Sequence, residues 1–184
     1  VAMAALASRL QSDDGLLRHA LDLTVQGCDR ASRLVEQLLT LSRLEAGAAP
    51  TLVPVELGAL VRSVAGDLAP LALQRQQTIE VEATQPRPVP GDSTLLAVLV
   101  RNLVDNAIRY GPAGTVVKIR LASQQGRVLL SFDDSGPGMA EADIARMGER
   151  FFRVVGSGQS GSGLGWSIVR RIAAVHGVEV RVDR

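Results

Sequence analysis

The sequence predicts an α+β protein in which helices precede an α/β sandwich domain. Residues 16–44 carry small and apolar side chains at alternating intervals of four and three, which is typical of a packed helix. Residues 57–184 then mix helical and strand patterns, after a break that contains glycine and proline. Hydrophobic residues make up 46% of the 184 residues and aromatic residues only 3%, so we expect an aliphatic core.

Residues 1–46 are expected to form a helical hairpin. The short polar residues and glycine of Ser12-Asp-Asp-Gly15 favour a turn between an Ala/Leu-rich first helix and a second helix over residues 16–44. The second helix carries a seam typical of a coiled coil or bundle: Ala20, Thr24, Gly27, Ala31, Leu34, Leu38 and Leu41. An adjoining stripe consists of Val25, Cys28, Val35 and Leu39. One short partner cannot cover both stripes, so we expect two hairpins to form a dimeric four-helix bundle, with Cys28 as a small buried hydrophobe.

Residues 47–53 are expected to be a linker, and residues 54–184 a second domain. Its first expected elements are a short strand or helix entry at 55–57, a helix at 57–73, a strand at 79–83 and a helix from the N-cap Asp92 to Tyr110. A turn at 111–114 and a hairpin of strands at 116–122 and 127–133 follow. The last expected elements are a short helix at 144–147, a helix at 166–176 and a strand at 178–182.

Composition narrows the class of protein. The formal net charge of +1 gives no general attraction to nucleic acid, and we expect no nucleic-acid partner. A single cysteine excludes a disulfide framework within the chain. No apolar run approaches the length of a membrane span, and no signal peptide is visible. Because the chain starts at Val1 without an initiator Met, we expect it to be part of a longer protein.

Four short blocks between residues 102 and 165 suggest a nucleotide pocket. They are Asn102-Leu-Val-Asp-Asn106, Asp134-Ser-Gly-Pro-Gly138, Arg150-Phe-Phe-Arg153 and Gly161-Ser-Gly-Leu-Gly165. In the first block, Asn102 and Asn106 are one helical turn apart and face the same way. Their neutral carboxamide oxygens suit Mg²⁺ shared with phosphate, although helix-surface asparagines have the same spacing. Arg109 lies within reach of a phosphate.

The second and fourth blocks are rich in glycine. Asp134 at a strand end can accept a hydrogen bond from an exocyclic amine such as that of adenine, and Gly136 and Gly138 allow a tight turn near a ligand; an ordinary β-turn fits equally, and Asp133 is adjacent. Gly161-Ser-Gly-Leu-Gly165 precedes a helix, where backbone N–H groups favour phosphate. Residues 156–163 are interpreted as a lid or as a flexible linker. A P-loop is excluded, because no Gly-Lys-Ser/Thr occurs.

In this order the blocks resemble the N, G1, F and G2 boxes of the sensor histidine kinases of bacterial two-component systems. The match is strongest over residues 101–112 and 161–169, and residues 29–45 resemble the second helix of the family's dimerisation and phosphotransfer domain. The likeness is greatest to membrane sensors of the QseC and PmrB kind. It implies the Bergerat ATP-binding fold that gyrase, Hsp90 and MutL share, with ATP and Mg²⁺ as cofactors. It also implies a homodimer, a response-regulator receiver domain as partner, and the cytoplasmic portion of a bacterial inner-membrane protein.

The resemblance implies a role for each block. Asn106 would bind Mg²⁺, with Asn102 supporting it or contacting phosphate, and Arg109 and Tyr110 would lie along the nucleotide. Asp134 would bind the adenine amino group in a pocket shaped by Gly136 and Gly138. The phosphates would be held by Gly161, Gly163, Leu164 and Gly165. Phe151 and Phe152 would anchor a lid, contact a partner helix or pack in the core.

The sequence departs from the family pattern at three places. Gly111 stands where a small hydroxyl residue is common, which would remove a polar contact. Trp166 replaces an aliphatic residue after the last glycine. The chain ends at Arg184, where the family has a further glycine-rich turn and strand, so we expect an incomplete sheet.

The family's phosphate acceptor, a histidine in a His-Glu-Leu-Arg-Thr-Pro-like block, has no counterpart here. His19 is expected to be an exposed helix residue, and His176, at a helix end that mildly favours a cation, is expected to be structural. We therefore expect no catalytic residue of this kind in these 184 residues and no autophosphorylation. Two alternatives remain: an ATP-driven dimerising clamp of the gyrase, Hsp90 and MutL type, and a nucleotide-regulated scaffold without catalysis. The clamp enzymes carry a carboxylate base where this chain has Asn102.

Overall fold

The computed structural model describes residues 2–45, 51–83, 88–124, 126–147, 149 and 162–183, with side chains described from residue 15 onward except those of residues 22, 26, 29 and 30. The chain divides into two compact units, Val1–Thr40 and Leu41–Arg184, which are considered separately. Among the described residues, no helix combines the length and the apolar character that crossing a membrane requires.

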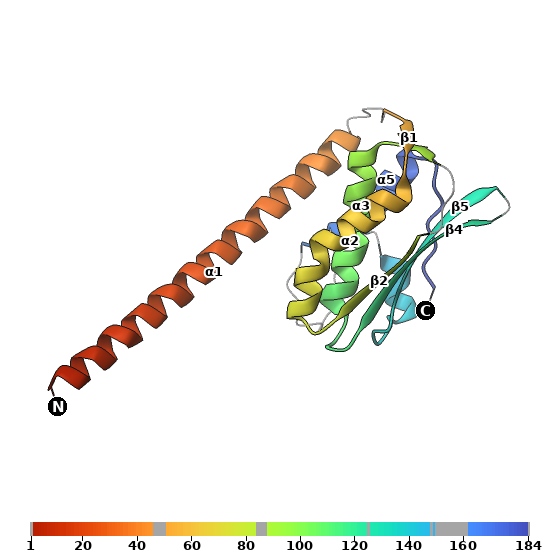
Figure 1. Ribbon diagram of the computed structural model, residues 1–184. Helices are drawn as coiled ribbons and strands as arrows, with labels where there is room; N and C mark the ends of the chain where they lie inside the picture. The colour runs from red at the N-terminus through yellow and green to blue at the C-terminus, as the bar shows by residue number, and fades with distance from the viewer. Residues whose placement is uncertain are drawn as a thin grey trace. The chain divides into compact units, whose positions relative to one another are not determined.

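A single helix, α1 (Ala2–Glu45), replaces the expected hairpin (Figure 1). The predicted turn at Ser12–Gly15 is wrong: the chain remains helical there. A glycine in a helix costs only about 1 kcal/mol relative to alanine, and no proline interrupts residues 2–45, so the helical preference of the flanking residues prevails. Cys28 is exposed rather than buried, and His19 is exposed as expected.

The second unit is a two-layer sandwich built on a three-stranded sheet. β2 (Thr78–Ala83) runs parallel to β4 (Val116–Gln124), which pairs antiparallel with β5 (Arg127–Asp134), so the strand order is β2-β4-β5. The expected hairpin is confirmed, with Gln124 opposite Arg127. A second, two-stranded sheet pairs β1 (Val53–Val55) with β3 (Val89–Gly91).

Helices cover one face of the three-stranded sheet (Figure 1). They include α2 (Leu57–Gln74) and α3 (Ser93–Tyr110), whose buried side chains join those of β4 in the main core. Two further helices follow in the chain, α4 (Glu141–Arg146) and α5 (Gly165–Val175), and α5 packs against α3. The expected mixture of helices and sheet in this unit is therefore confirmed.

Alternation along β4 and β5 decides which side chains meet the helices. Val117, Ile119 and Leu121 are at most 1% exposed, while Lys118 and Arg120 between them face outward. On β5, Val128, Leu130 and Phe132 pack against the same core. Successive residues of a strand point to opposite faces, so Asp134 continues the inward series and Asp133 the outward one.

The segment after α5 differs from expectation. Residues 178–183 form no strand, although Val178-Glu-Val-Arg-Val182 alternates. Val178 and Val180 are 53% and 37% exposed, and the described part of the sheet pairs β5 with β4 only. Alternation predicts a strand only where a partner strand supplies hydrogen bonds and a surface to pack on, so the predicted strand is wrong.

Candidate nucleotide-binding site

The first block lies on α3, whose start is determined by its N-cap. The Asp92 carboxylate accepts hydrogen bonds from the N–H groups of Thr94 (3.0 Å) and Leu95 (3.1 Å), as its position predicts. Leu96, Val100, Val104 and Ile108 then form the buried stripe of the helix. Asn102 and Asn106 lie beside this stripe and are half-buried, so the main core and the candidate site share one helix.

The two asparagines face the start of α5. A Cβ atom on Gly165 would lie only 2.9 Å from Asn102 Oδ1 and 3.7 Å from Asn106 Oδ1. Asn102 Nδ2 donates to Val98 O (2.8 Å), which directs the carboxamide oxygen toward Gly165. The structure therefore brings the first and fourth blocks together, with two neutral oxygens beside a position where a side chain would displace the Asn102 carboxamide. Two such oxygens are a donor set that fits Mg²⁺ shared with phosphate.

The second block forms a turn directly after β5. Asp134 Oδ1 accepts a hydrogen bond from the Gly136 N–H (2.9 Å), and Gly138 has a φ of +71°, which favours glycine. A Cβ on Gly136 would lie 3.9 Å from Gly111 Cα, so this turn approaches the end of α3. The second block thus lies beside the end of α3, the helix that carries the first block, although Asn106 and Asp134 are 28 positions apart in the sequence.

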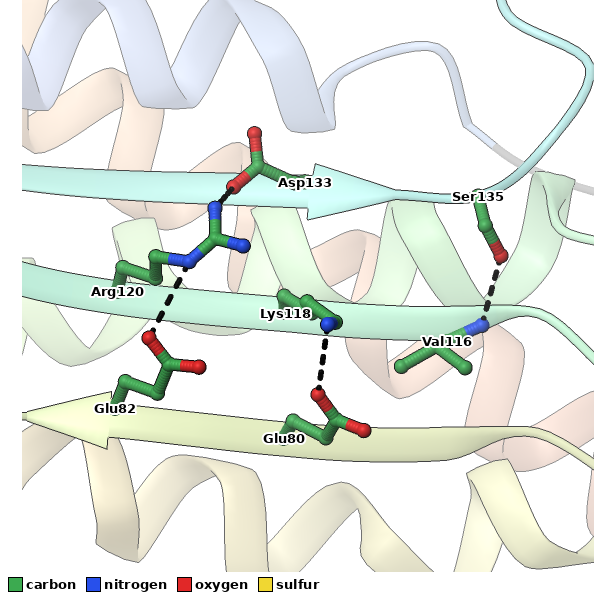
Figure 2. A network of polar contacts seen from close by, with 7 residues as sticks. All are labelled: Glu80, Glu82, Val116, Lys118, Arg120, Asp133 and Ser135. Carbon is green, nitrogen blue, oxygen red and sulfur yellow. Dashed lines mark hydrogen bonds and ion pairs between the residues drawn. The ribbon is translucent and has the colours of Figure 1, made fainter.

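The neighbouring aspartates differ in their surroundings. Asp133 belongs to an ion-pair ladder on the outer face of the sheet, where Arg120 Nη1 donates to its Oδ2 (2.7 Å) and Arg120 Nε lies 3.3 Å from Glu82 (Figure 2). Lys118 and Glu80 form the next rung, at 3.3 Å. Asp134 lies on the opposite face, toward the helices. Of the two carboxylates, only that of Asp134 takes part in the glycine turn.

Arg109 and Tyr110 lie in the last turn of α3. Arg109 Nε donates to Asp105 Oδ2 (2.6 Å), an ion pair along the helix whose side chains are 23% and 24% exposed. Tyr110 is 41% exposed. The sequence interpretation assigned Arg109 to a phosphate but did not anticipate that Asp105 would orient it.

Two buried polar residues that the sequence interpretation missed, Gln77 and Thr115, lie at the end of α3. Gln77 Nε2 donates to the carbonyl oxygens of Ile108 (3.1 Å), Gly111 (2.6 Å) and Pro112 (3.1 Å). A Cβ on Gly111 would lie 2.8 Å from Thr115 Oγ1, so the Thr115 hydroxyl lies against Gly111. Gly111 is the position at which a small hydroxyl residue is common in the family. The Gln77 hydrogen bonds join residues 31 to 35 positions apart, and no local pattern indicates them.

The fourth block is described from Ser162 onward. Gly163 has a φ of +70°, Leu164 is fully buried, and Ser162 Oγ accepts a hydrogen bond from the Leu164 N–H (3.2 Å). Trp166 Nε1 is buried and makes no hydrogen bond with the described residues. Gly161, the block Arg150-Phe-Phe-Arg153 and most of the expected lid, residues 156–161, lie outside the described residues.

His176 fastens the other end of α5 to α3. Its Nε2 accepts a hydrogen bond from the Asp92 N–H (3.0 Å), and its Nδ1 lies 2.8 Å from Ile172 O. With Nε2 as the acceptor, Nδ1 is the nitrogen that can donate to Ile172 O. His176 therefore holds the end of α5 against the start of α3, which agrees with the structural role expected for it.

Comparison with known proteins relates this chain to a family of ATPases. Residues 91–184 match the family of histidine kinase-, DNA gyrase B- and HSP90-like ATPases. The sensor protein QseC of Salmonella typhi is 42% identical over 176 residues, which cover 94% of this chain and 38% of QseC. The chain thus spans well under half the length of this relative.

Solved structures agree with the sequence match. Full-length ShkA, crystallised in complex with AMPPNP, has a TM-score of 0.68 at 34% identity and covers 79% of this chain and 31% of its own. The cytoplasmic segment of the histidine kinase QseC has a TM-score of 0.54 at 34% identity, covering 81% of this chain and 80% of that segment. The chain belongs to the histidine kinase-, DNA gyrase B- and HSP90-like ATPase family, and residues 91–184 are an ATP-binding catalytic domain of the sensor histidine kinase kind.

Proposed function

We propose that this chain binds ATP with Mg²⁺ between α3, the turn after β5 and the start of α5, and that it donates the γ-phosphoryl group to a histidine outside these 184 residues. The observation that carries the proposal is the approach of Gly165 to Asn102 and Asn106, because it joins the phosphate-binding glycines to two oxygens suited to Mg²⁺. When bound, the metal would be held chiefly by Asn106 and would neutralise phosphate charge.

The same arrangement suggests which part of the nucleotide each of the other candidate residues would contact. Asp134, on the helix-facing side of β5, would accept a hydrogen bond from the adenine amino group within the turn of Gly136 and Gly138. Gly161, Gly163, Leu164 and Gly165 would hold the phosphates through backbone N–H groups. Arg109, oriented by Asp105, and Tyr110 would lie along the nucleotide.

Neither histidine of the chain suits the role of phosphate acceptor. Both ring nitrogens of His176 are used in holding α5, so phosphorylation there would break the bond to Asp92 or to Ile172. His19 lies exposed on α1 without the acidic residue and proline of the family's acceptor block. We infer that the chain is the donor half of the reaction and that the longer protein then passes the phosphoryl group to an aspartate of a response regulator, as sensor histidine kinases do.

α1 supports a homodimer of the longer protein. Between residues 15 and 40 its large apolar side chains are 38% to 66% exposed: Leu16, Leu17, Leu21, Leu23, Val25, Leu34, Val35, Leu38 and Leu39. An exposed apolar surface of this length calls for a partner helix, and a second copy of α1 offers the same seam. We infer that the dimer forms through α1, and that the longer protein is a bacterial inner-membrane sensor with this chain in its cytoplasmic portion.

Phosphoryl transfer tests this proposal. With radiolabelled ATP and Mg²⁺, the chain alone should gain no acid-labile label, whereas a longer version that includes the acceptor histidine should gain it. Addition of the chain to an acceptor-bearing version with Asn106→Ala should restore labelling, because the chain supplies an intact donor site. Acid-labile label on the chain alone, or no label in the longer version, would contradict the proposal.

The clamp alternative is disfavoured by the chemistry of Asn102. A carboxamide has no basic oxygen to take a proton from water. The nearest carboxylate in the same helix, Asp105, is engaged with Arg109.

A further inference from the structure

The last turn of α1 belongs to the second unit and packs near the candidate pocket. Leu41 and Leu44 are 6% and 3% exposed, in contrast to the exposed apolar residues earlier in α1. They form a cluster with Leu164, Ile168 and Ile172, all three fully buried. The two leucines therefore pack on α5, the helix that begins at Gly165.

A polar contact accompanies this packing. Arg171 donates to the carbonyl oxygen of Leu44 from Nε (3.3 Å) and from Nη2 (2.9 Å). The last four carbonyl groups of a helix have no partner within the helix, and the helix dipole favours a cation there. Arg171 thus caps α1 from a residue 127 positions later in the chain.

The cluster reaches the pocket at two points. Leu164 belongs to the cluster and is bonded to Gly165, which faces Asn102 and Asn106. Val98 of α3 also packs against the cluster, and its carbonyl oxygen accepts the hydrogen bond that orients Asn102. A displacement of Leu41 and Leu44 would therefore shift both Gly165 and Asn102.

The far end of α5 is held, which restricts how the helix can respond. His176 ties that end to Asp92 at the start of α3. If the last turn of α1 separates from α5, the end of α5 that can move is its N-terminal end, which begins at Gly165 and follows Leu164. Packed interfaces tend to switch between discrete arrangements rather than deform continuously.

We propose that Arg171 is a positioning residue of the nucleotide pocket: it holds the end of α1 on α5, so that ATP binding and docking of the last turn of α1 strengthen each other. The inference rests on the proposed function, because it needs ATP–Mg²⁺ to bind beside Gly165. Coupling between two sites is reciprocal, so each event must favour the other by the same factor. Through this contact the last turn of α1, residues 41–45, regulates the affinity of the pocket.

Hydrogen exchange on the unaltered chain is the first test. ATP with Mg²⁺ should slow amide exchange in residues 41–45 by about fivefold or more, the usual lower range of coupling between sites. Exchange in β4, which the proposal does not involve, should change little. ATP that binds without altering exchange in residues 41–45 overturns the inference and leaves the proposed function standing.

Substitution of Arg171 is the second test. Arg171→Met keeps the length of the side chain but removes its donors, and should weaken ATP binding about fivefold or more and abolish the nucleotide-dependent protection of residues 41–45. Arg171→Lys, which retains a charged donor, should recover part of both effects. Arg170→Met removes the same charge from the exposed neighbouring residue and should match the unaltered chain.

The outcomes separate the two claims. If Arg171→Met binds ATP as tightly as the unaltered chain, the coupling is wrong. If the unaltered chain binds no ATP, the proposed function fails, and the coupling fails with it. Should Arg171→Met not fold, the exchange measurement on the unaltered chain decides alone.

Discussion

Gly165 is a residue of the candidate site at which a side chain would meet a neighbouring carboxamide. Its backbone begins α5 within reach of the two carboxamides of α3, and Asn102 is held in place by Val98 O. A Cβ here would lie 2.9 Å from Asn102 Oδ1. The fit between the first and fourth blocks is therefore set by one glycine and one oriented amide.

Gly165→Ala should weaken binding of ATP–Mg²⁺ about tenfold, because the new Cβ displaces the Asn102 carboxamide. Its effect on folding should be small, since alanine suits a helix. Isothermal titration and thermal unfolding measure the two effects. Gly66→Ala is the matched control, because Gly66 lies in α2 with open space around it. Equal ATP affinity in the two variants would show that Gly165 does not lie against the bound nucleotide.

At the scale of elements, α3 carries both the core stripe and the asparagines, so its start and end must be well defined. Asp92 caps its first turn, and Gln77 Nε2 donates hydrogen bonds to three carbonyl oxygens around its end. The Asp92 cap can be predicted from the sequence, because an N-cap aspartate bonds to residues that follow it directly. The Gln77 hydrogen bonds join distant segments, so they are seen only in the folded chain.

Asp92→Ala should lower the free energy of unfolding by about 1 kcal/mol, the usual value of an N-cap. Asp92→Asn should retain most of the stability, because its side-chain oxygen still accepts from Thr94 and Leu95. Denaturant unfolding measures the difference. The control is Asp67→Ala, which removes an exposed ion pair with Arg101 and should change stability by under about 0.5 kcal/mol. A loss at Asp67 as large as that at Asp92 would contradict the capping role.

The sequence predicted most elements of the second unit, because alternation and capping act locally. It failed at residues 12–15, where turn-forming residues are too weak to end a helix without proline. It also failed at residues 178–182, where alternation lacked a partner strand. In the candidate site, spacing pointed to the asparagine pair, which lies beside Gly165, and to the glycine turns. Gln77 and Arg171 were missed, because each acts through a contact distant in sequence. Thr115 was missed because no periodic pattern marks a turn residue as buried.

At the scale of the whole molecule, the exposed seam of α1 is the feature that a single copy leaves unexplained. Leu38→Glu should convert a dimer into a monomer, because the carboxylate would be buried against the partner helix. Sedimentation velocity measures the mass. Glu36→Arg changes a charge on the opposite side of the helix, and the dimer should persist. A monomeric unaltered chain at high concentration would contradict dimerisation through α1.

The central claim, an ATP–Mg²⁺ pocket between α3 and α5, is tested most directly by calorimetric titration of the chain with ATP, with and without Mg²⁺. The account predicts one ATP bound per chain, tighter with Mg²⁺. It also predicts that Asn106→Ala binds at least about tenfold more weakly in the presence of the metal and shows little response to its removal. The absence of ATP binding by the unaltered chain, or an Asn106→Ala variant with unchanged affinity and metal dependence, would contradict the account.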